Sequence, residues 1–346
     1  ARGEIVLFPS SGTGAWEATI VNTLNPGDRV LAFNVGHFSH LFAECARRHG
    51  VLVDEVDLPW DQGVPAALVQ ERLGGDRGHT YRAVLAVHNE TSTGVTTDLR
   101  AIREAMDAVK HPALLLVDTV SSLASIDFRF DEWGVDVAVC GSQKGLMLPP
   151  GMGILCVGPK ALAAGEKGGS PRYFFDWRPV IDQNAQGFYP YTPATLLLVG
   201  LREALDMLFE EGLEQVFARH HRLAEGVRRA VRTWGLRTVC ENPSEASNTL
   251  TAVYVPDGAS ADAVLHTALR RYNLPLGVGL GRLKGKAFRI GHLGWLNELE
   301  ILAAVAGVEM ALTEVGVQVP LGAGVKAAQQ FFLETAQARV ARPVAG

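Results

Sequence analysis

Lys144 lies in a short loop of small and polar residues, a setting in which a lysine can do chemistry. The loop reads Cys-Gly-Ser-Gln-Lys-Gly-Leu at residues 140–146 and follows an apolar run that begins at Val135. An amine on a glycine-flanked loop after a buried strand can reach a carbonyl carbon, and partial loss of solvent lowers its pKa. The sequence therefore predicts that Lys144 acts as a nucleophile.

Asp118 ends another apolar run, residues 113–117, and is also expected at the carboxyl end of a strand. A lysine and an aspartate in such positions suit pyridoxal phosphate. Its aldehyde bonds to an amine, and a carboxylate keeps its ring nitrogen protonated so that the ring can take up electrons. We therefore expect Lys144 and Asp118 to face opposite edges of one cofactor ring.

Residues 10–14 read Ser-Ser-Gly-Thr-Gly and join the first apolar run to a helix expected from Trp16. Backbone N–H groups, hydroxyls and the helix dipole converge at such a junction and favour an anion. The segment lacks the Gly-Lys-Ser/Thr ending of a P-loop, and Glu17 stands where a dinucleotide fingerprint has its third glycine. Taken alone, it is either a phosphate site or a tight strand-to-helix turn.

Two further loops follow expected strands. Gly-His-Phe at 36–38 offers a ring that can stack on a flat heterocycle, with the glycine letting the backbone approach; a core role for Phe38 is the alternative. His-Asn-Glu-Thr-Ser-Thr-Gly at 88–94 is dense in hydrogen-bonding groups, at a strand end where open α/β sheets bind ligands. Its alternative is a capped turn.

Arg289 lies in a short apolar strand within Phe-Arg-Ile-Gly-His-Leu-Gly, residues 288–294. A guanidinium there needs a partner, which is either a substrate carboxylate held by two hydrogen bonds or a structural salt bridge. Just upstream, Gly-Val-Gly-Leu-Gly at 277–281 lacks a following helix. We expect a flexible turn there and not a phosphate loop.

The histidines do not form a metal-ligand pattern. The pairs at 37 and 40 and at 220 and 221, and the single His292, lack the carboxylate or cysteine spacing of zinc sites. We predict no metal. The basic residues between Arg219 and Arg232 are expected to form a solvated helix face.

Composition and charge limit the class of protein. The 346 residues are 47% hydrophobic, which suits a large buried core and favours two domains. The net charge of −5, without a long run of one sign, argues against a nucleic-acid or anionic-membrane partner. No apolar stretch is long enough to span a bilayer. The four cysteines are widely spaced, which fits reduced thiols in a cytoplasm.

The first half alternates short apolar runs with amphipathic segments, which predicts an α/β fold with a mostly parallel sheet. The seven expected strands are Ile5–Phe8, Val30–Phe33, Leu52–Val56, Ala83–Val87, Leu114–Val117, Val135–Val139 and Ile154–Val157. Apolar spacing near 3.6 with glycine or proline stops predicts helices at Trp16–Leu24, Ser39–His49, Leu99–Val109, Thr195–Glu210 and Leu213–Thr233.

Near residue 235 the pattern changes to isolated strands mixed with helices. The expected strands are Leu236–Cys240, Thr249–Val255 and Ala287–Ile290, and the expected helices are Ala261–Tyr272 and Leu296–Val315. We therefore predict a large domain at 1–234, a smaller α+β domain at 235–320, and a helical tail at 321–346, with its helix at Val325–Ala341.

The motifs occur in one order along the chain: Ser-Gly-Thr-Gly, Gly-His-Phe, Asn-Glu-Thr-Ser-Thr-Gly, Val-Asp-Thr-Val-Ser-Ser, Gly-Ser-Gln-Lys-Gly and Arg-Ile-Gly-His-Leu-Gly. Together they closely resemble the class V, fold-type I aminotransferases that act on glyoxylate, and most of all the bacterial serine-glyoxylate enzymes. The resemblance covers residues 4–316, and the segments around Asp118 and Lys144 are its most specific parts.

This resemblance implies a role for each motif. Lys144 would bind pyridoxal phosphate covalently and act as the base, Asp118 would pair with the ring nitrogen, and Phe38 would stack on the ring. The residues placed near the phosphate are Ser11, Gly12, Thr13 and Gln143. Thr91 would lie near the ring, and Arg289 would hold the α-carboxylate of the substrate. The reaction implied is transfer of an amino group, with serine as the expected donor, to glyoxylate.

The resemblance also implies a homodimer. Tyr189 and Thr192 match a Tyr-x-x-Thr motif that reaches the cofactor phosphate of the neighbouring subunit. Members of the family carry a Gly/Pro-rich arm before the first strand, which lines the substrate pocket. The sequence begins at Ala1 without it, so we expect an upstream segment to be missing.

Other readings remain open at this stage. Alanine or aspartate could replace serine as the donor, because pocket shape decides that choice. A cysteine desulfurase would need a mobile cysteine near the cofactor, for which Cys240 is the only candidate by position. A binding protein without activity would not need both Asp118 and Lys144.

Overall fold

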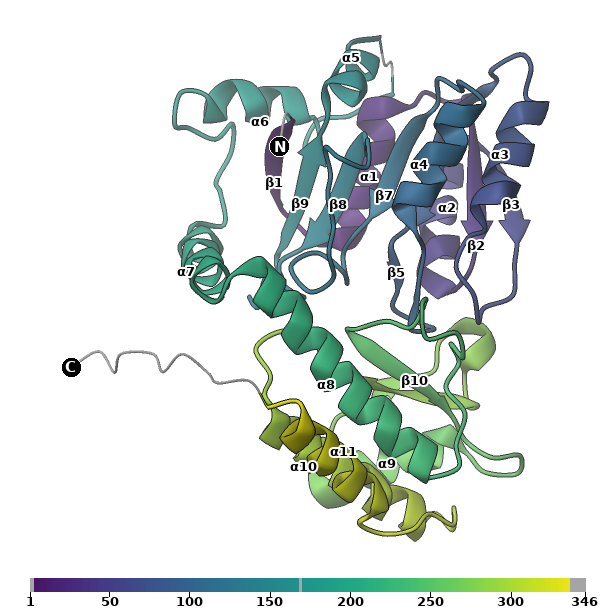
Figure 1. The fold of residues 1–346 in the computed structure, drawn as a ribbon. Coiled ribbons are helices and arrows are strands. Elements are labelled where there is room, and N and C mark those ends of the chain that lie inside the picture. Colours follow the sequence, from purple (N-terminus) through teal and green to yellow (C-terminus); the bar gives the residue numbers. More distant parts are fainter. Residues whose placement is uncertain (1–2, 168–169, 337–346) are drawn as a thin grey trace.

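The computed structural model describes residues 3–167 and 170–336 of the chain (Figure 1). Its main sheet has seven strands, in the order β1-β9-β8-β7-β4-β2-β3. Their bounds are β1 Glu4–Pro9, β2 Arg29–Asn34, β3 Leu52–Asp57, β4 Tyr81–Val87, β7 Leu114–Asp118, β8 Val137–Gly141 and β9 Met152–Val157. All seven predicted strands are therefore confirmed.

Strands β3, β2, β4, β7 and β8 are parallel, whereas β9 runs antiparallel to both β8 and β1. Five parallel strands place five carboxyl ends at one edge of the sheet. In open α/β sheets this is the edge where ligands bind. The predicted α/β class with a mostly parallel sheet is confirmed.

Helices cover both faces of the sheet (Figure 1). One face packs on α1 (Gly12–Thr23) and α2 (His37–Arg48), and the other on α3 (Ala66–Gly75) and α4 (Leu99–Ala108). In β2, Val30 and Ala32 enter the first core, while Leu31 and Phe33 enter the second. Alternation along a strand sends successive side chains to opposite faces, so nearly continuous apolar runs fill both cores.

Two helices, α7 (Thr195–Glu211) and α8 (Leu213–Thr233), lead from the sheet toward the C-terminal part of the chain. There, β10 (Leu250–Tyr254), β12 (Ala287–Gly291) and β11 (Gly277–Val278) form an antiparallel sheet in that order. It packs with α9 (Ala261–Tyr272), α10 (Glu298–Glu314) and α11 (Ala323–Glu334). The smaller α+β unit is thus present.

Several predicted elements differ from the structure. Leu236–Cys240 is not a strand: Thr238 forms only an isolated bridge to Val253. The turn predicted at 277–281 contains β11, because pairing with β12 orders Gly277 and Val278. Three helices were not predicted: α3, α5 (Pro159–Lys167) and α6 (Trp177–Asn184). The predicted tail helix is present as α11, and residues 337–341 of that prediction lie outside the described residues.

The predicted domain limits at residues 234 and 320 stay a prediction. Leu223 and Val231 of α8 share a core with Phe331 and Phe332 of α11. The C-terminal helix therefore docks along α8. Among residues 3–167 and 170–336, we find no helix with the length and apolar character needed to cross a membrane.

Candidate active site

Asp118 and Lys144 reach the same edge of the sheet from neighbouring parallel strands. Asp118 is the last residue of β7, opposite Val139 of β8 and Val87 of β4. β8 ends two residues later at Gly141, and Lys144 lies in the turn that follows. The adjacency of β7 and β8 therefore brings together two residues that are distant in the sequence.

The Asp118 carboxylate is 4% exposed and held from two sides. Oδ1 accepts a hydrogen bond from the Val120 N–H at 2.7 Å, and Oδ2 accepts one from Trp16 Nε1 at 3.0 Å. Burial, helped by the Glu90 charge, raises the pKa of Asp118 to about 7, although the bonds from Val120 and Trp16 and the Lys144 charge oppose the rise. A cation placed beside this carboxyl would reverse the shift.

Lys144 is half-buried in a turn whose backbone is tightly held. Ser142 Oγ donates to the Pro149 carbonyl at 2.8 Å and accepts from the Met152 N–H at 3.2 Å. A Cβ at Gly145 would lie 2.0 Å from the Leu123 carbonyl oxygen, so only glycine fits there. Burial lowers the pKa of Lys144, the Arg289 cation lowers it further, and Asp118 opposes both. Lys144 therefore lies within electrostatic range of both Asp118 and Arg289.

The N-terminus of α1 and the loop after β8 form an anion cradle. Ser11 caps the helix by accepting the Gly14 N–H at 3.4 Å. A Cβ at Gly12 would lie 2.7 Å from Val120, and one at Gly141 would lie 2.8 Å from Gln143 Oε1. Among the described residues, Gln143 Oε1 is buried without a hydrogen-bond partner. An anion at this point would meet the N–H groups of a helix N-terminus, and the NH2 group of Gln143, not its Oε1, would have to face it.

Ser11 and Thr13 at the start of α1 are exposed, whereas Gly12 is buried. The four residues predicted near a phosphate, Ser11, Gly12, Thr13 and Gln143, therefore lie around one helix end. The structure also explains why the sequence there is rich in glycine. Larger side chains would clash with Val120 and Ser10. This fits a phosphate-bearing cofactor.

Phe38 lies in the first turn of α2, half-buried against the core between the sheet and α1. Gly36 precedes the helix, and a Cβ there would lie 2.2 Å from Glu90 Cγ. The missing side chain of Gly36 leaves room for Glu90, which gives this glycine a packing role. The expectation that Gly36 also admits a ligand to the backbone stays a prediction. The capped turn at 88–94 is also present, because the Gly94 N–H donates to the Glu90 carbonyl at 2.9 Å.

Arg289 of β12 points back to the first part of the chain. Its Nε donates to the Val278 carbonyl at 2.9 Å and its Nη1 donates to the Thr91 carbonyl at 2.7 Å. Within residues 3–167 and 170–336, no carboxylate lies within 4.0 Å of it. Of the two alternatives from the sequence, the salt bridge is therefore absent from the described chain. The guanidinium charge therefore has no carboxylate partner within the described chain.

Thr91 lies beside Arg289 and is fixed by a second bond, because its Oγ1 donates to Ser121 Oγ at 2.7 Å. Tyr189 and Thr192 lie between α6 and α7. Tyr189 packs on the core beside β1, and Thr192 is exposed. Their predicted role toward a neighbouring subunit stays a prediction.

Comparison with known proteins agrees with this geometry. A family model described as aminotransferase class V matches residues 1–280. The chain belongs to the class V aminotransferase family. It is 50% identical to an L-aspartate-glyoxylate aminotransferase of Paracoccus denitrificans, over 97% of this chain and 85% of the other. It is also 50% identical to a serine-glyoxylate aminotransferase of Arabidopsis thaliana, over 95% and 82%.

Solved structures of aminotransferases superpose closely on this one. The ureidoglycine-glyoxylate aminotransferase of Bacillus subtilis gives a TM-score of 0.89 at 27% identity, covering 95% of this chain and 85% of that one. The pyridoxamine-pyruvate aminotransferase of Mesorhizobium loti gives 0.89 at 29% identity, covering 96% and 85%. The fold predicted for this aminotransferase, fold type I, is thereby confirmed.

Sequence reasoning missed three residues that build the site of this aminotransferase. Trp16 binds Asp118, Ser121 binds Thr91, and Glu90 caps α2. Trp16 and Ser121 carry no distinguishing pattern, because a tryptophan in a helix and a serine in a loop are ordinary. Glu90 offered a signal: a carboxylate between an apolar strand and a Thr-Ser-Thr-Gly turn must find donors once buried.

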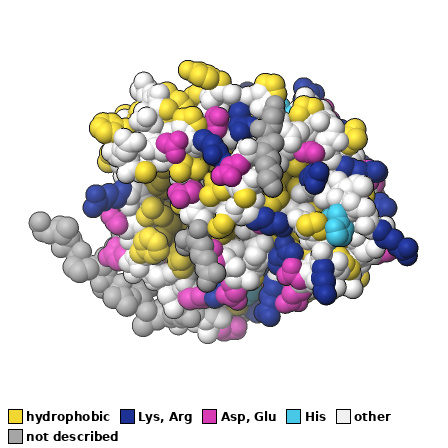
Figure 2. All heavy atoms as spheres, turned by 90° about the horizontal axis from the view of Figure 1, so that it is seen from above, with side chains coloured by type: hydrophobic (Ala, Val, Ile, Leu, Met, Phe, Trp, Pro, Cys, Tyr) yellow, Lys and Arg dark blue, Asp and Glu magenta, His cyan; other side chains and the backbone are white. Residues whose placement is uncertain are grey.

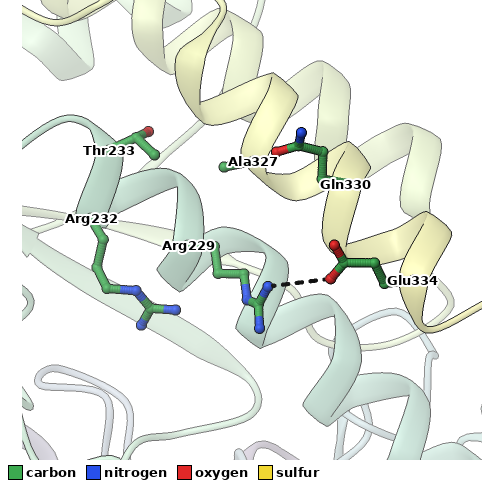
Figure 3. Close-up of a pocket in the computed structure, with 6 residues that line it drawn as sticks. All are labelled: Arg229, Arg232, Thr233, Ala327, Gln330 and Glu334. Atoms are coloured by element: carbon green, nitrogen blue, oxygen red, sulfur yellow. Dashed lines mark ion pairs between the residues drawn. The ribbon is translucent and has the colours of Figure 1, made fainter.

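A groove between α8 and α11 lies apart from this site (Figure 3). Two arginines line it, but Arg229 pairs with Glu225 at 3.1 Å and Glu334 at 3.9 Å, and Arg232 pairs with Glu225 at 2.5 Å. Because its cations already have anionic partners, the groove is a poor ligand site.

Two other readings of the sequence meet physical objections. Burial raises the pKa of the Cys240 thiol to about 11, which makes it a poor nucleophile for a desulfurase. Among the described residues, no group of three or more His, Cys, Asp and Glu side chains is arranged to hold a metal. His292 is instead buried between Thr251 and the Asn248 carbonyl.

Proposed function

We propose that this aminotransferase binds pyridoxal phosphate and transfers the amino group of L-serine to glyoxylate, giving hydroxypyruvate and glycine. The observation that carries the proposal is geometric: Asp118 and Lys144 follow the neighbouring parallel strands β7 and β8, and Arg289 reaches across to the Thr91 carbonyl. The charges of Asp118 and Arg289 both act on Lys144. The relatives that are 50% identical and named for glyoxylate support the acceptor.

The residues present fit the cofactor. The N-terminus of α1 with Ser11, Gly12, Thr13 and the side-chain NH2 group of Gln143 would hold its phosphate. Phe38 would cover one face of its ring, with Thr91 nearby. When bound, the cofactor supplies an aldehyde for the amine and a ring that takes up electrons.

Each charged residue has a distinct task in this proposal. Asp118 would keep the proton on the ring nitrogen, a task suited to a buried carboxylate whose own bonds come from fixed N–H groups. Arg289 would bind the α-carboxylate of the amino acid and of the oxo acid. Lys144 Nζ, with its lowered pKa, would remove the proton from the α-carbon of the amino acid. It would then return that proton to the carbon that carried the aldehyde of the cofactor.

We also propose that the aminotransferase works as a homodimer. Large apolar side chains are exposed on the segment that runs from α5 through α7: Tyr173, Phe174, Phe188, Leu196, Val199 and Phe209. Figure 2 shows apolar side chains gathered around a hollow on the side where Figure 1 places α6. Exposed apolar patches mark interaction surfaces. Tyr189 and Thr192 lie in this segment, so a partner's site would lie within their reach.

The proposed location is the cytoplasm. All four cysteines are free thiols in the structure, and burial raises the pKa of Cys45 and Cys140 to about 12. Free, unreactive thiols fit a reducing compartment.

L-aspartate is the second candidate donor, because the relative from Paracoccus denitrificans is as similar as the serine enzymes. The test is a donor profile: kcat/KM for L-serine, L-aspartate and L-alanine with glyoxylate as acceptor. We expect the highest value for L-serine. A preference for L-aspartate would replace the donor and keep the acceptor. No transfer to glyoxylate from any of the three would overturn the proposal.

A further inference from the structure

Glu90 is a buried carboxylate that the proposed reaction does not use. Only 1% of the surface of Glu90 is exposed. Oε1 accepts from the Phe38 N–H at 3.3 Å, the Ser92 N–H at 3.0 Å and Ser92 Oγ at 2.7 Å, and Oε2 accepts from the Ser39 N–H at 2.9 Å. All four groups donate hydrogen bonds to the carboxylate, which is the arrangement that suits an acceptor-only group.

These bonds make Glu90 the cap of α2 from a distant part of the chain. Gly36 at the N-cap has no side chain to accept a bond, and α2 has no acidic residue in its first turn. Ser92 Oγ accepts the His37 N–H at 2.9 Å, and Glu90 accepts the next two N–H groups. An anion at a helix N-terminus also meets the positive end of the helix dipole. The backbone of Phe38 is thus clamped to β5 (Asn89–Glu90).

The same residue shapes the turn that orients Arg289. The Glu90 carbonyl accepts from the Thr93 N–H at 3.2 Å and the Gly94 N–H at 2.9 Å. This turn presents the Thr91 carbonyl to Arg289. The Glu90 charge also acts on both ends of the site: it adds to the burial that raises the pKa of Asp118, and it opposes the burial that lowers the pKa of Arg289. Glu90 therefore stands between the aromatic residue and the guanidinium.

We propose that Glu90 is a positioning residue whose carboxylate sets the ring of Phe38 and the guanidinium of Arg289 relative to each other. The inference rests on the proposed function for the roles of those two residues. A cap that served the helix alone would affect stability and nothing else. A positioning carboxylate also affects how the cofactor ring lies and how a carboxylate substrate binds.

Glu309 provides a matched control. It is 2% exposed, and its carboxylate accepts from the Gly322 N–H at 2.8 Å, the Gly324 N–H at 2.7 Å and Trp234 Nε1 at 2.9 Å. It therefore caps the start of α11, in the C-terminal core. Glu90→Gln and Glu309→Gln each remove one charge and one acceptor from a buried helix cap.

The experiment compares the full chain with Glu90→Gln, Ser92→Ala and Glu309→Gln, each loaded with pyridoxal phosphate. The first readout is the visible circular dichroism of the bound cofactor without substrate, which reports the setting of its ring. The second is KM against kcat for glyoxylate. We expect Glu90→Gln to change the dichroism and raise KM about tenfold, the size of one lost charged hydrogen bond. Ser92→Ala should change both in the same direction but less.

Glu309→Gln should lower the melting temperature and leave both readouts as in the parent chain. Parent-like dichroism and KM in both Glu90→Gln and Ser92→Ala would overturn the inference, as would the same changes in Glu309→Gln. The dichroism needs no substrate. A wrong amino donor would therefore leave this test intact, whereas failure of the parent chain to bind the cofactor would refute the proposed function itself.

Discussion

Two lysine-aspartate pairs lie at opposite edges of the main sheet. Asp136 precedes β8 at the amino edge, and Lys160 Nζ lies 3.5 Å from its Oδ2. The same lysine donates to the Ala113 carbonyl at 2.7 Å, and Asp136 Oδ2 also accepts the Leu115 N–H at 2.8 Å. In this pair the two charges neutralise each other, and the hydrogen bonds hold the start of β7 against the residue that precedes β8.

The pair at the carboxyl edge is built differently. Asp118 is bound by N–H groups of Trp16 and Val120, and Lys144 acts on it only as one charge among several. Burial lowers the pKa of both lysines and raises that of both aspartates, but among the described residues only Lys160 has its aspartate within 4.0 Å. The comparison favours a functional role for the pair whose charges the fold does not join in an ion pair within the described chain.

The largest expected effect separates the two lysines. Lys144→Ala should lower the rate of half-transamination of L-serine by a factor of about 10²–10⁴, the usual contribution of a general base. Lys160→Ala should keep the parent rate and lose stability. Stopped-flow absorbance of the bound cofactor measures the rate, and thermal unfolding measures stability. A parent-like rate in Lys144→Ala would sink its assigned role.

The two aspartates give the next largest contrast. Asp118→Asn should still bind the cofactor but lose turnover by about 10²-fold, since the neutral amide no longer favours a protonated ring nitrogen. Asp136→Asn should leave kcat unchanged, because its partners are structural. Steady-state kinetics on both variants decides the matter, and equal losses would mean that the distinction between the edges is wrong.

Two arginines extend the comparison: Arg289 has no carboxylate partner in the described chain, whereas Arg222 has one. Arg289→Lys should raise KM for glyoxylate about tenfold, because a lysine cannot offer the two parallel donors of a guanidinium. Arg222 serves as the control, because its guanidinium already bonds to Glu298 and to Thr335 Oγ1, the latter at 2.9 Å. Arg222→Lys should alter the melting temperature and not KM. An unchanged KM in Arg289→Lys would contradict the carboxylate role.

The last contrast concerns stability and not turnover: a pH dependence of unfolding in the protein without cofactor. The folded-state pKa of Asp118 is raised from 3.8 to about 7, so between these values the folded state holds more protons than the unfolded state. Its contribution to stability is therefore lost as pH rises from about 4 to 7 and is constant above that. Asp118→Asn should gain melting temperature over the parent across this window. A difference that does not vary with pH would show that Asp118 titrates normally.

The fold was largely predictable from the sequence because its strands are buried on both faces. Continuous runs such as Leu114–Val117 have no other plausible environment. Helices without a strong apolar stripe escaped detection: α3 buries only Val69 and Leu73 and ends in two glycines. The short strand β11 exists only through its pairing with β12, which no local pattern encodes.

Site residues were predictable where their chemistry is rare and less so where it is shared. A lysine and an aspartate after apolar strands stand out, whereas the partners that fix them do not. Trp16 resembles any core tryptophan until the sheet order places it beside Asp118. The packing role of Gly36 could not be predicted from its own segment, because the side chain that needs its space lies more than fifty positions away, at Glu90.

The bond from Arg289 to the Thr91 carbonyl has a consequence for which molecules the site accepts. A peptide oxygen steers a guanidinium without cancelling its charge, whereas a glutamate in that place would have quenched it. The charge of Arg289 is thus left without an anionic partner in the described chain, so a bound carboxylate would be attracted to it. Amino acid esters, amino acid amides and simple alkyl amines carry no carboxylate. We therefore expect them to bind this site weakly, even when they are small enough to reach Arg289.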